Sequence, residues 1–196
     1  ISELANENPY EKERLLLTAA QILRDVKKPA DALEVLKNGL TEFPRSTNIL
    51  YDYALTAENL GKYGEMEISL KKIIEIDPQY QQAYNALGYS LADRNIRLEE
   101  AHALIEKAMK LSPNDPFITD SLGWVLFRQG KIEEAEQQLR QAYQLRADPE
   151  IAVHLGEVLW VKGDKEEAMT FFRHAKAKDA KNELLHSTLS RLKIGL

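Results

Sequence analysis

Cysteine is absent from this 196-residue sequence, and proline and glycine are scarce. Without cysteine the chain has no disulfide bond, thiolate metal site or cysteine nucleophile. That absence suits a reducing cytosol and a bacterial periplasm equally well, so both compartments stay open. Seven prolines and nine glycines are too few for a disordered or collagen-like chain. The composition therefore indicates an ordinary folded protein.

Long apolar runs and large basic patches are also missing. The run Leu15-Leu16-Leu17 ends at Thr18, whereas a membrane span needs about 18 apolar residues. The net charge is −5, and the densest basic spot consists only of Arg24, Lys27 and Lys28. Proteins that bind nucleic acid normally show a larger basic face. We therefore expect neither direct membrane insertion by this segment nor a nucleic-acid partner.

Motifs for catalysis and cofactor binding are missing as well. None of the four histidines belongs to a pair spaced for metal binding, and there is no glycine-rich phosphate loop or Gly-x-Ser-x-Gly turn. Acidic pairs such as Glu99-Glu100 begin predicted helices, where carboxylates favour the helix dipole. His154 is better explained as a polar residue that lines a binding surface. We predict no catalytic residue, no metal site and no cofactor, and hence no enzyme activity.

A fixed period runs through the sequence. Pro44, Pro78 and Pro113 end similar segments and lie 34 and 35 residues apart. Leu-Gly pairs and small residues recur in register with these prolines. The recurring positions are Leu87-Gly88, Leu122-Gly123 and Leu155-Gly156, followed by Ala101, Ala135 and Ala168. A period of this length is the sequence signature of a repeat array.

Each repeat reads as two helices. Leu122, Val125 and Leu126 share one face at helical spacing. Asp115-Pro116 supplies an N-cap carboxylate and a proline suited to the first helical position. Gly130 can take the left-handed conformation that ends a helix. No alternating strand pattern of useful length occurs, so the sequence predicts an all-α protein.

These recurring positions resemble the tetratricopeptide repeat family. That family repeats a bulky residue, a Leu-Gly pair, an aromatic residue or leucine, two alanines and a proline at set positions. The third repeat matches with Tyr84, Leu87, Gly88, Leu91, Ala101, Ile105, Ala108 and Pro113. The resemblance implies a right-handed superhelical solenoid of about five helix-turn-helix repeats plus a C-terminal capping helix.

The repeat register divides the chain into three parts. Residues 13–181 form five repeats that start near residues 13, 47, 81, 116 and 149. Residues 182–196 form the capping helix, with leucines on its packed side. Residues 1–12 read as the tail of a preceding helix or a truncated repeat. Because the chain begins at Ile1 rather than at methionine, we expect it to be a piece of a longer protein.

The resemblance also implies where a partner binds. In this family the first helix of each repeat lines a concave groove. Here that groove should combine aromatic, arginine and polar side chains, which are typical of interaction hot spots. The predicted partner-binding residues are Tyr51, Asn85, Tyr89, Asp120, Trp124, Phe127, Arg128, His154 and Trp160. Packing between neighbouring first helices is the competing explanation for Phe127 and Trp160, and it also stays open for Tyr89 and Trp124.

We therefore predict a protein-interaction scaffold that binds a partner protein or peptide segment in its concave groove. Two alternatives stay open: a structural module that self-associates, and a non-catalytic arm that presents substrates to an enzyme elsewhere in a longer chain. The phrases Asp120-Ser121-Leu122-Gly123-Trp124 and His154-Leu155-Gly156-Glu157 also resemble envelope-associated tetratricopeptide proteins of Gram-negative bacteria. That resemblance implies a location in the bacterial periplasm or at the outer membrane, with the cytoplasm as the alternative.

Overall fold

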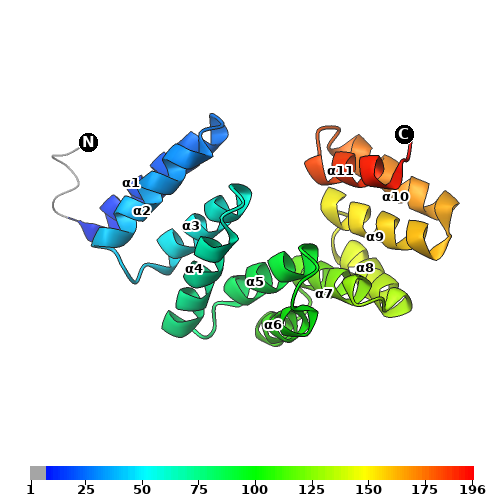
Figure 1. Ribbon diagram of the computed structural model, residues 1–196, viewed down its shortest axis with the longest axis horizontal. Coiled ribbons are helices and arrows are strands. Elements are labelled where there is room, and N and C mark those ends of the chain that lie inside the picture. The colour runs from blue at the N-terminus through cyan, green and yellow to red at the C-terminus, as the bar shows by residue number, and fades with distance from the viewer. Residues whose placement is uncertain (1–7) are drawn as a thin grey trace. The chain divides into compact units, whose positions relative to one another are not determined.

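The structure, a computed structural model, describes residues 8–196, and these residues form helices joined by short turns (Figure 1). The helices are α1 (Pro9–Asp25), α2 (Pro29–Glu42), α3 (Thr47–Asn59), α4 (Tyr63–Ile76), α5 (Gln81–Asp93), α6 (Leu98–Leu111), α7 (Pro116–Arg128), α8 (Ile132–Leu145), α9 (Pro149–Lys162), α10 (Lys165–Lys178) and α11 (Glu183–Leu192). No strand occurs in this part of the chain, and the all-α prediction is confirmed. None of the helices between residues 8 and 196 combines the length and apolar content that a membrane span requires.

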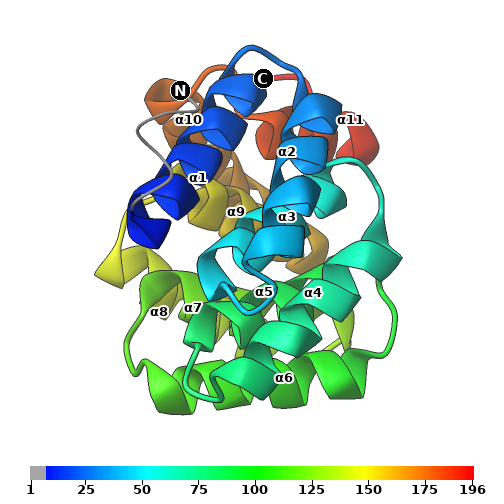
Figure 2. The same cartoon turned by 90° about the vertical axis from the view of Figure 1, so that its left-hand side faces the viewer.

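Successive helices pack as antiparallel pairs. The packed pairs are α1 with α2, α3 with α4, α7 with α8, and α9 with α10. Helices α5 and α6 are also in close contact at Gly88, where an added Cβ atom would lie only 2.7 Å from Ile105 Cγ1. The first pair is seen side by side in Figure 2. Five helical hairpins followed by a closing helix are what the repeat pattern predicted, and this prediction is confirmed.

The chain divides into two compact units, Ile1–Ala83 and Tyr84–Leu196. Unit 1 contains α1 to α4, and unit 2 contains most of α5 and all of α6 to α11. The two units are described separately below. The tail predicted for residues 1–12 lies partly outside the described residues, and α1 begins at Pro9 with the Asn8 side chain as its N-cap.

Local sequence explains where the helices begin and end. The Asp115 carboxylate accepts hydrogen bonds from the backbone N–H groups of Phe117 (2.9 Å) and Ile118 (3.1 Å). These bonds satisfy donors that the start of α7 would otherwise leave unpaired. Gly130 follows α7 with a φ of +80°, a conformation that glycine adopts without steric cost. Both features match the signals in the sequence.

Small residues allow the two helices of a hairpin to approach closely. A Cβ atom added at Gly123 would lie only 2.5 Å from Leu139 Cγ and 3.2 Å from the carbonyl oxygen of Ala135. The core of unit 2 continues from this contact to Leu155 and Phe172, which are fully buried. Burying each such large side chain stabilises the fold by about 1.5–3 kcal/mol. The repeated Leu-Gly and Ala positions are therefore packing positions.

Helix α11 closes the apolar side of the last hairpin. It packs against α9 and α10, with Leu185 fully buried and Leu189 9% exposed. The Asn182 side chain caps its start by accepting a hydrogen bond from the backbone N–H of Leu185 at 2.8 Å. Arg191 and Lys193 remain exposed. This two-sided character is what a terminal helix of a repeat array requires.

Candidate functional site

A buried ion pair lies at the centre of unit 2. His154 on α9 approaches the Asp120 carboxylate on α7, with its Nδ1 atom 2.9 Å from Oδ2 and 3.0 Å from Oδ1. His154 is 2% exposed and Asp120 is 6% exposed. The two residues are 34 positions apart, which is one repeat, so the pair joins two adjacent first helices. A carboxylate only accepts hydrogen bonds, so His154 Nδ1 must carry a proton.

The surroundings of His154 favour its charged form. Burial opposes a charged imidazolium, but the Asp120 carboxylate, assisted by Glu157 and Glu150, outweighs burial and raises the pKa of His154 above its ordinary value. The second ring nitrogen, Nε2, lies 3.3 Å from the Tyr89 hydroxyl on α5. When the imidazole is neutral, Nε2 accepts from that hydroxyl, because the only ring proton is on Nδ1. One side chain thus connects three helices.

Aromatic groups surround the imidazole. The Trp124 ring stacks on it with centroids 4.3 Å apart and an interplanar angle of 23°. The Phe127 ring centroid lies 5.3 Å from that of Trp124. The Arg128 guanidinium lies 5.7 Å from the Trp124 ring centroid and donates to the carbonyl oxygen of Asp93 at 3.3 Å. We call this set, Tyr89, Asp120, Trp124, Phe127, Arg128 and His154, the His154 cluster.

Exposure divides the His154 cluster into two layers. Asp120, Trp124 and His154 are buried, and Trp124 is only 2% exposed. Tyr89, Phe127 and Arg128 are partly exposed. The buried layer is almost closed off from solvent, and it fixes the positions of the outer layer. Because His154 is closed off from solvent, the Asp–His pair cannot meet a substrate, although its geometry resembles that of acid–base pairs.

Two half-exposed residues in this region carry polar atoms without a partner. In the described part of the chain, Asn85 Oδ1 and Arg128 Nε are buried and make no hydrogen bond. Asn85 lies one helical turn before Tyr89 on α5. Unpaired buried polar atoms are costly, typically about 1–3 kcal/mol each.

A second buried carboxylate lies at the end of unit 2. Glu157 on α9 is 1% exposed, and Arg191 on α11 donates to both of its oxygens at 2.7 and 2.8 Å. These hydrogen bonds raise the pKa of the Arg191 guanidinium, so the arginine remains charged. The pair is again 34 residues apart. It fastens the closing helix to the preceding first helix.

Unit 1 has its own polar surface. Arg24 on α1 donates to the Asp52 carboxylate at 3.0 Å and to the Thr56 hydroxyl at 3.1 Å, both on α3. Tyr51 on α3 lies with its ring centroid 5.7 Å from that of Tyr80, and burial raises the pKa of Tyr51 to about 12. A cavity of about 540 Å³ is lined by Gln21, Arg24, Lys27, Pro29, Asp52, Leu55, Thr56 and Asn59.

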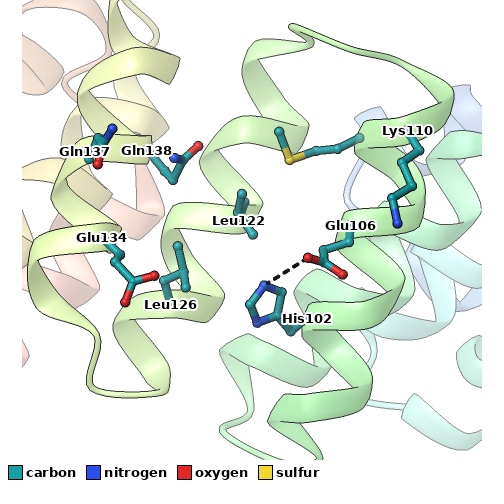
Figure 3. A pocket seen from close by; sticks show the side chains of 9 residues that line it. His102, Glu106, Lys110, Leu122, Leu126, Glu134, Gln137 and Gln138 are labelled. Atoms are coloured by element: carbon teal, nitrogen blue, oxygen red, sulfur yellow. Dashed lines mark ion pairs between the residues drawn. The ribbon is translucent and has the colours of Figure 1, made fainter.

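Another cavity opens between the second helices of two repeats in unit 2, α6 and α8 (Figure 3). It measures about 500 Å³, and Leu122 and Leu126 of α7 contribute its apolar lining. His102 lies 3.8 Å from Glu106 across one turn of α6. Charges of both signs surround the cavity, since Lys110 and Glu134 also line it. Nothing in this lining selects one kind of partner.

The structure brings together six of the nine predicted binding residues, in the His154 cluster. Asn85 lies on the same helix as Tyr89. Trp160 instead lines a separate cavity beside α10, and it packs against the core of unit 2 as Phe127 does. Tyr51 belongs to unit 1. The partner-binding role of these nine residues stays a prediction.

The buried pairs were not predicted from the sequence. The available signal was their spacing, because residues 34 apart occupy neighbouring repeats and come side by side on successive first helices. An acidic residue and a histidine or arginine at that spacing, as in Asp120 with His154 and Glu157 with Arg191, are therefore candidates for an ion pair. Within residues 8–196, no group of three or more His, Asp or Glu side chains is arranged to hold a metal ion.

Comparison with known proteins agrees with this architecture. The family described as "Tetratricopeptide repeat" matches residues 3–188. The TPR repeat-containing protein PA4667 of Pseudomonas aeruginosa is 41% identical over 157 residues, which is 80% of this chain and 27% of that protein. The chain therefore spans about a quarter of the length of this curated relative.

Solved structures share the fold. TTC0263, a thermophilic TPR protein of Thermus thermophilus, has a TM-score of 0.80 at 25% identity and covers 93% of this chain and 100% of its own. PilW, a widely conserved type IV pilus biogenesis factor, has a TM-score of 0.75 at 17% identity, covering 92% of this chain and 86% of its own. At that identity the likeness to PilW concerns the fold alone.

Proposed function

This chain belongs to the tetratricopeptide repeat family, whose members are generally protein-interaction scaffolds, and on that premise we propose that unit 2 binds a partner polypeptide segment over its His154 cluster. The observation that supports the proposal is the layered construction of the cluster. A rigid buried layer of Asp120, Trp124 and His154 holds Tyr89, Phe127 and Arg128 at the surface. We further propose that the chain is not an enzyme.

Burying the charged Asp120–His154 pair costs more free energy than burying apolar side chains would. Removing two charged groups from water carries a desolvation penalty, and apolar residues of similar volume often serve stability as well or better. Packing of the hairpins does not need the ion pair, because the alanines, glycines and leucines already form a continuous core. We therefore propose that the role of the Asp120–His154 pair is to position the side chains of the outer layer. A preorganised surface loses less conformational entropy on binding.

The outer layer suits a polypeptide rather than a small molecule. Aromatic residues and arginine are the types that dominate binding energy in protein interfaces. Phe127 offers a face for an apolar side chain of the partner. The Arg128 guanidinium and the Asn85 side-chain amide are partly exposed and can bond to partner backbone groups. We therefore propose a segment with one apolar anchor and an exposed backbone.

Site-specific photo-crosslinking in cells of the source species tests this proposal. A photoreactive residue is placed at Phe127 in one variant and at Gln144, an exposed position on α8, in the control. A partner of this surface crosslinks at Phe127 and not at Gln144. The purified partner is then titrated against Phe127→Ala and Gln144→Ala. Losing a true anchor of about 2 kcal/mol weakens binding by roughly thirtyfold, whereas Gln144→Ala binds like the parent.

Circular dichroism separates loss of binding from unfolding. Because Phe127 also packs against the core of unit 2, Phe127→Ala should melt at a lower temperature, and the titration is run where its spectrum still matches that of the parent. Equal crosslinking at both positions, or a partner that binds Phe127→Ala as tightly as the parent, would move the site away from the His154 cluster. Light scattering across concentration then distinguishes self-association, in which the crosslinked partner is a second copy of the chain.

A further inference from the structure

A cavity on another side of unit 2 carries an excess of positive charge. It measures about 630 Å³ and lies among the end of α9, the start of α10 and the segment after α11. Its lining consists of Trp160, Lys165, Glu166, Met169, Arg173, Lys193, Ile194 and Gly195. The spacing of four residues places Lys165, Met169 and Arg173 on one face of α10. No residue of this cavity belongs to the His154 cluster.

The walls of this cavity are fixed by the fold. Trp160, Met169 and Ile194 all pack against the hydrophobic core of unit 2. Lys193 has a φ of +56°, which turns the chain back after α11. The backbone N–H of Ile194 then donates to the carbonyl oxygen of Leu189 at 2.9 Å. The last residues are thereby held against α10.

The charges around the cavity are unbalanced. Three cations, Lys165, Arg173 and Lys193, face a single carboxylate, Glu166, although the whole chain has a net charge of −5. In the described part of the chain none of these three cations makes an ion pair. Nearby Arg140 contrasts with them, since it bonds to two glutamates.

Helix stability does not explain this arrangement. Lys165 is the first residue of α10, where the helix dipole favours an anion over a cation. Its ammonium instead lies 5.1 Å from the Trp160 ring centroid, a contact that holds the cation at the cavity. An aromatic ring, a flexible methionine and unpaired cations are together suited to a ligand that is both anionic and apolar.

We propose that this cavity binds an acidic polypeptide segment that carries one large apolar side chain. The cations attract carboxylates of the partner, while Trp160 and Met169 contact the apolar side chain, since methionine adapts to varied shapes. A cavity of a few hundred Å³ has the size of a side-chain or ligand pocket. An anionic lipid surface would require cations spread over a wider face, so a polypeptide is the better fit.

The test uses the full chain and a fluorescein-labelled peptide of glutamates around one central phenylalanine. Fluorescence anisotropy at low salt should show saturable binding that weakens as salt is added, because exposed charges are screened. Lys165→Glu with Arg173→Glu should weaken binding by about tenfold or more, equivalent to at least about 1.4 kcal/mol. The peptide with lysines in place of glutamates should not bind. Tryptophan emission should change on binding, and Trp160→Phe should abolish that change.

The matched control is Lys71→Glu with Lys131→Glu, two exposed lysines outside the cavity that give the same change in net charge. It should bind like the parent. If both double variants lose peptide affinity equally, the loss comes from the change in net charge alone, and the proposal is overturned. Absence of peptide binding would also overturn the proposal, including the case where phosphatidylglycerol vesicles bind instead.

If charge reversal unfolds the chain, as judged by circular dichroism, Lys165→Gln with Arg173→Gln replaces it. Arg128→Ala should leave peptide binding intact, so this test is independent of the His154 cluster.

Discussion

Replacing either member of the Asp120–His154 pair should destabilise unit 2, but by unequal amounts. His154→Gln leaves the Asp120 carboxylate buried without a cation, and breaking a buried pair in this way typically costs about 3–5 kcal/mol. Asp120→Asn leaves an imidazole that can become neutral, because burial then disfavours its charge. The remaining loss is that of hydrogen bonding, about 1–3 kcal/mol. We expect His154→Gln to be the more damaging substitution.

Urea unfolding followed by tryptophan fluorescence measures this difference directly. The chain has two tryptophans, Trp124 and Trp160, and both lie in unit 2, so the signal reports that unit alone. The unfolding free energy of each variant is compared with that of the parent at neutral pH. If Asp120→Asn costs as much as His154→Gln or more, the charged state assigned to the pair is wrong.

The pH dependence supplies a second check on the same pair. The pKa of His154 is raised in the folded state, so its stabilising contribution is complete below the ordinary value of about 6.5. That contribution is lost as the pH rises through the folded pKa. The unfolding free energy of the parent should therefore fall as the pH rises from about 6.5 through the raised pKa of folded His154. The His154→Gln variant should lack this contribution to the fall.

Three further predictions concern packing, the closing helix and ligands. Gly123→Ala should lower the unfolding free energy by about 1–3 kcal/mol through overpacking against Leu139. Gly64→Ala, with open space around its Cβ position, should raise the unfolding free energy by about 0.4–1 kcal/mol. Urea titration compares the two variants. Arg191→Gln should leave the Glu157 carboxylate buried without a cation and lower the melting temperature, and an unchanged melt would show that α11 is held by its leucines alone. Neither divalent metal ions nor nucleotides should raise the melting temperature in a thermal shift assay, because a ligand of the native state must stabilise it.

The sequence was sufficient to predict the fold because the packing signals recur. Leu122 and Gly123 have counterparts one repeat before and after them. The Asp115 N-cap marks the start of α7. A single helix boundary is weak evidence, but the same boundary at a fixed period is strong. The all-α class and the five helical hairpins followed directly.

The candidate binding residues could be assigned to helices from the sequence, but whether each side chain is buried or exposed could not be predicted. Trp124 occupies a position expected to face a groove, yet its stacking on His154 buries it. Burial there depends on which side chains lie on the adjoining helices, and a family pattern gives only the backbone position. Trp160 likewise departs from the predicted groove, because it packs against the core of unit 2 and lines a separate cavity with α10 and the segment after α11. The burial of a side chain thus depends on the residues of the adjoining helices, which the repeat pattern does not specify.

The contact between Tyr89 and His154 has a consequence for how such an array can evolve. The two residues are 65 positions apart, so this contact passes over one whole repeat, whereas the usual account of these arrays couples only nearest neighbours. Duplicating the hairpin that contains α7 would move the hydroxyl away from the imidazole, and deleting it would remove Asp120, which pairs with His154. The three hairpins from α5 to α10 are therefore coupled beyond nearest neighbours, and they are not interchangeable modules.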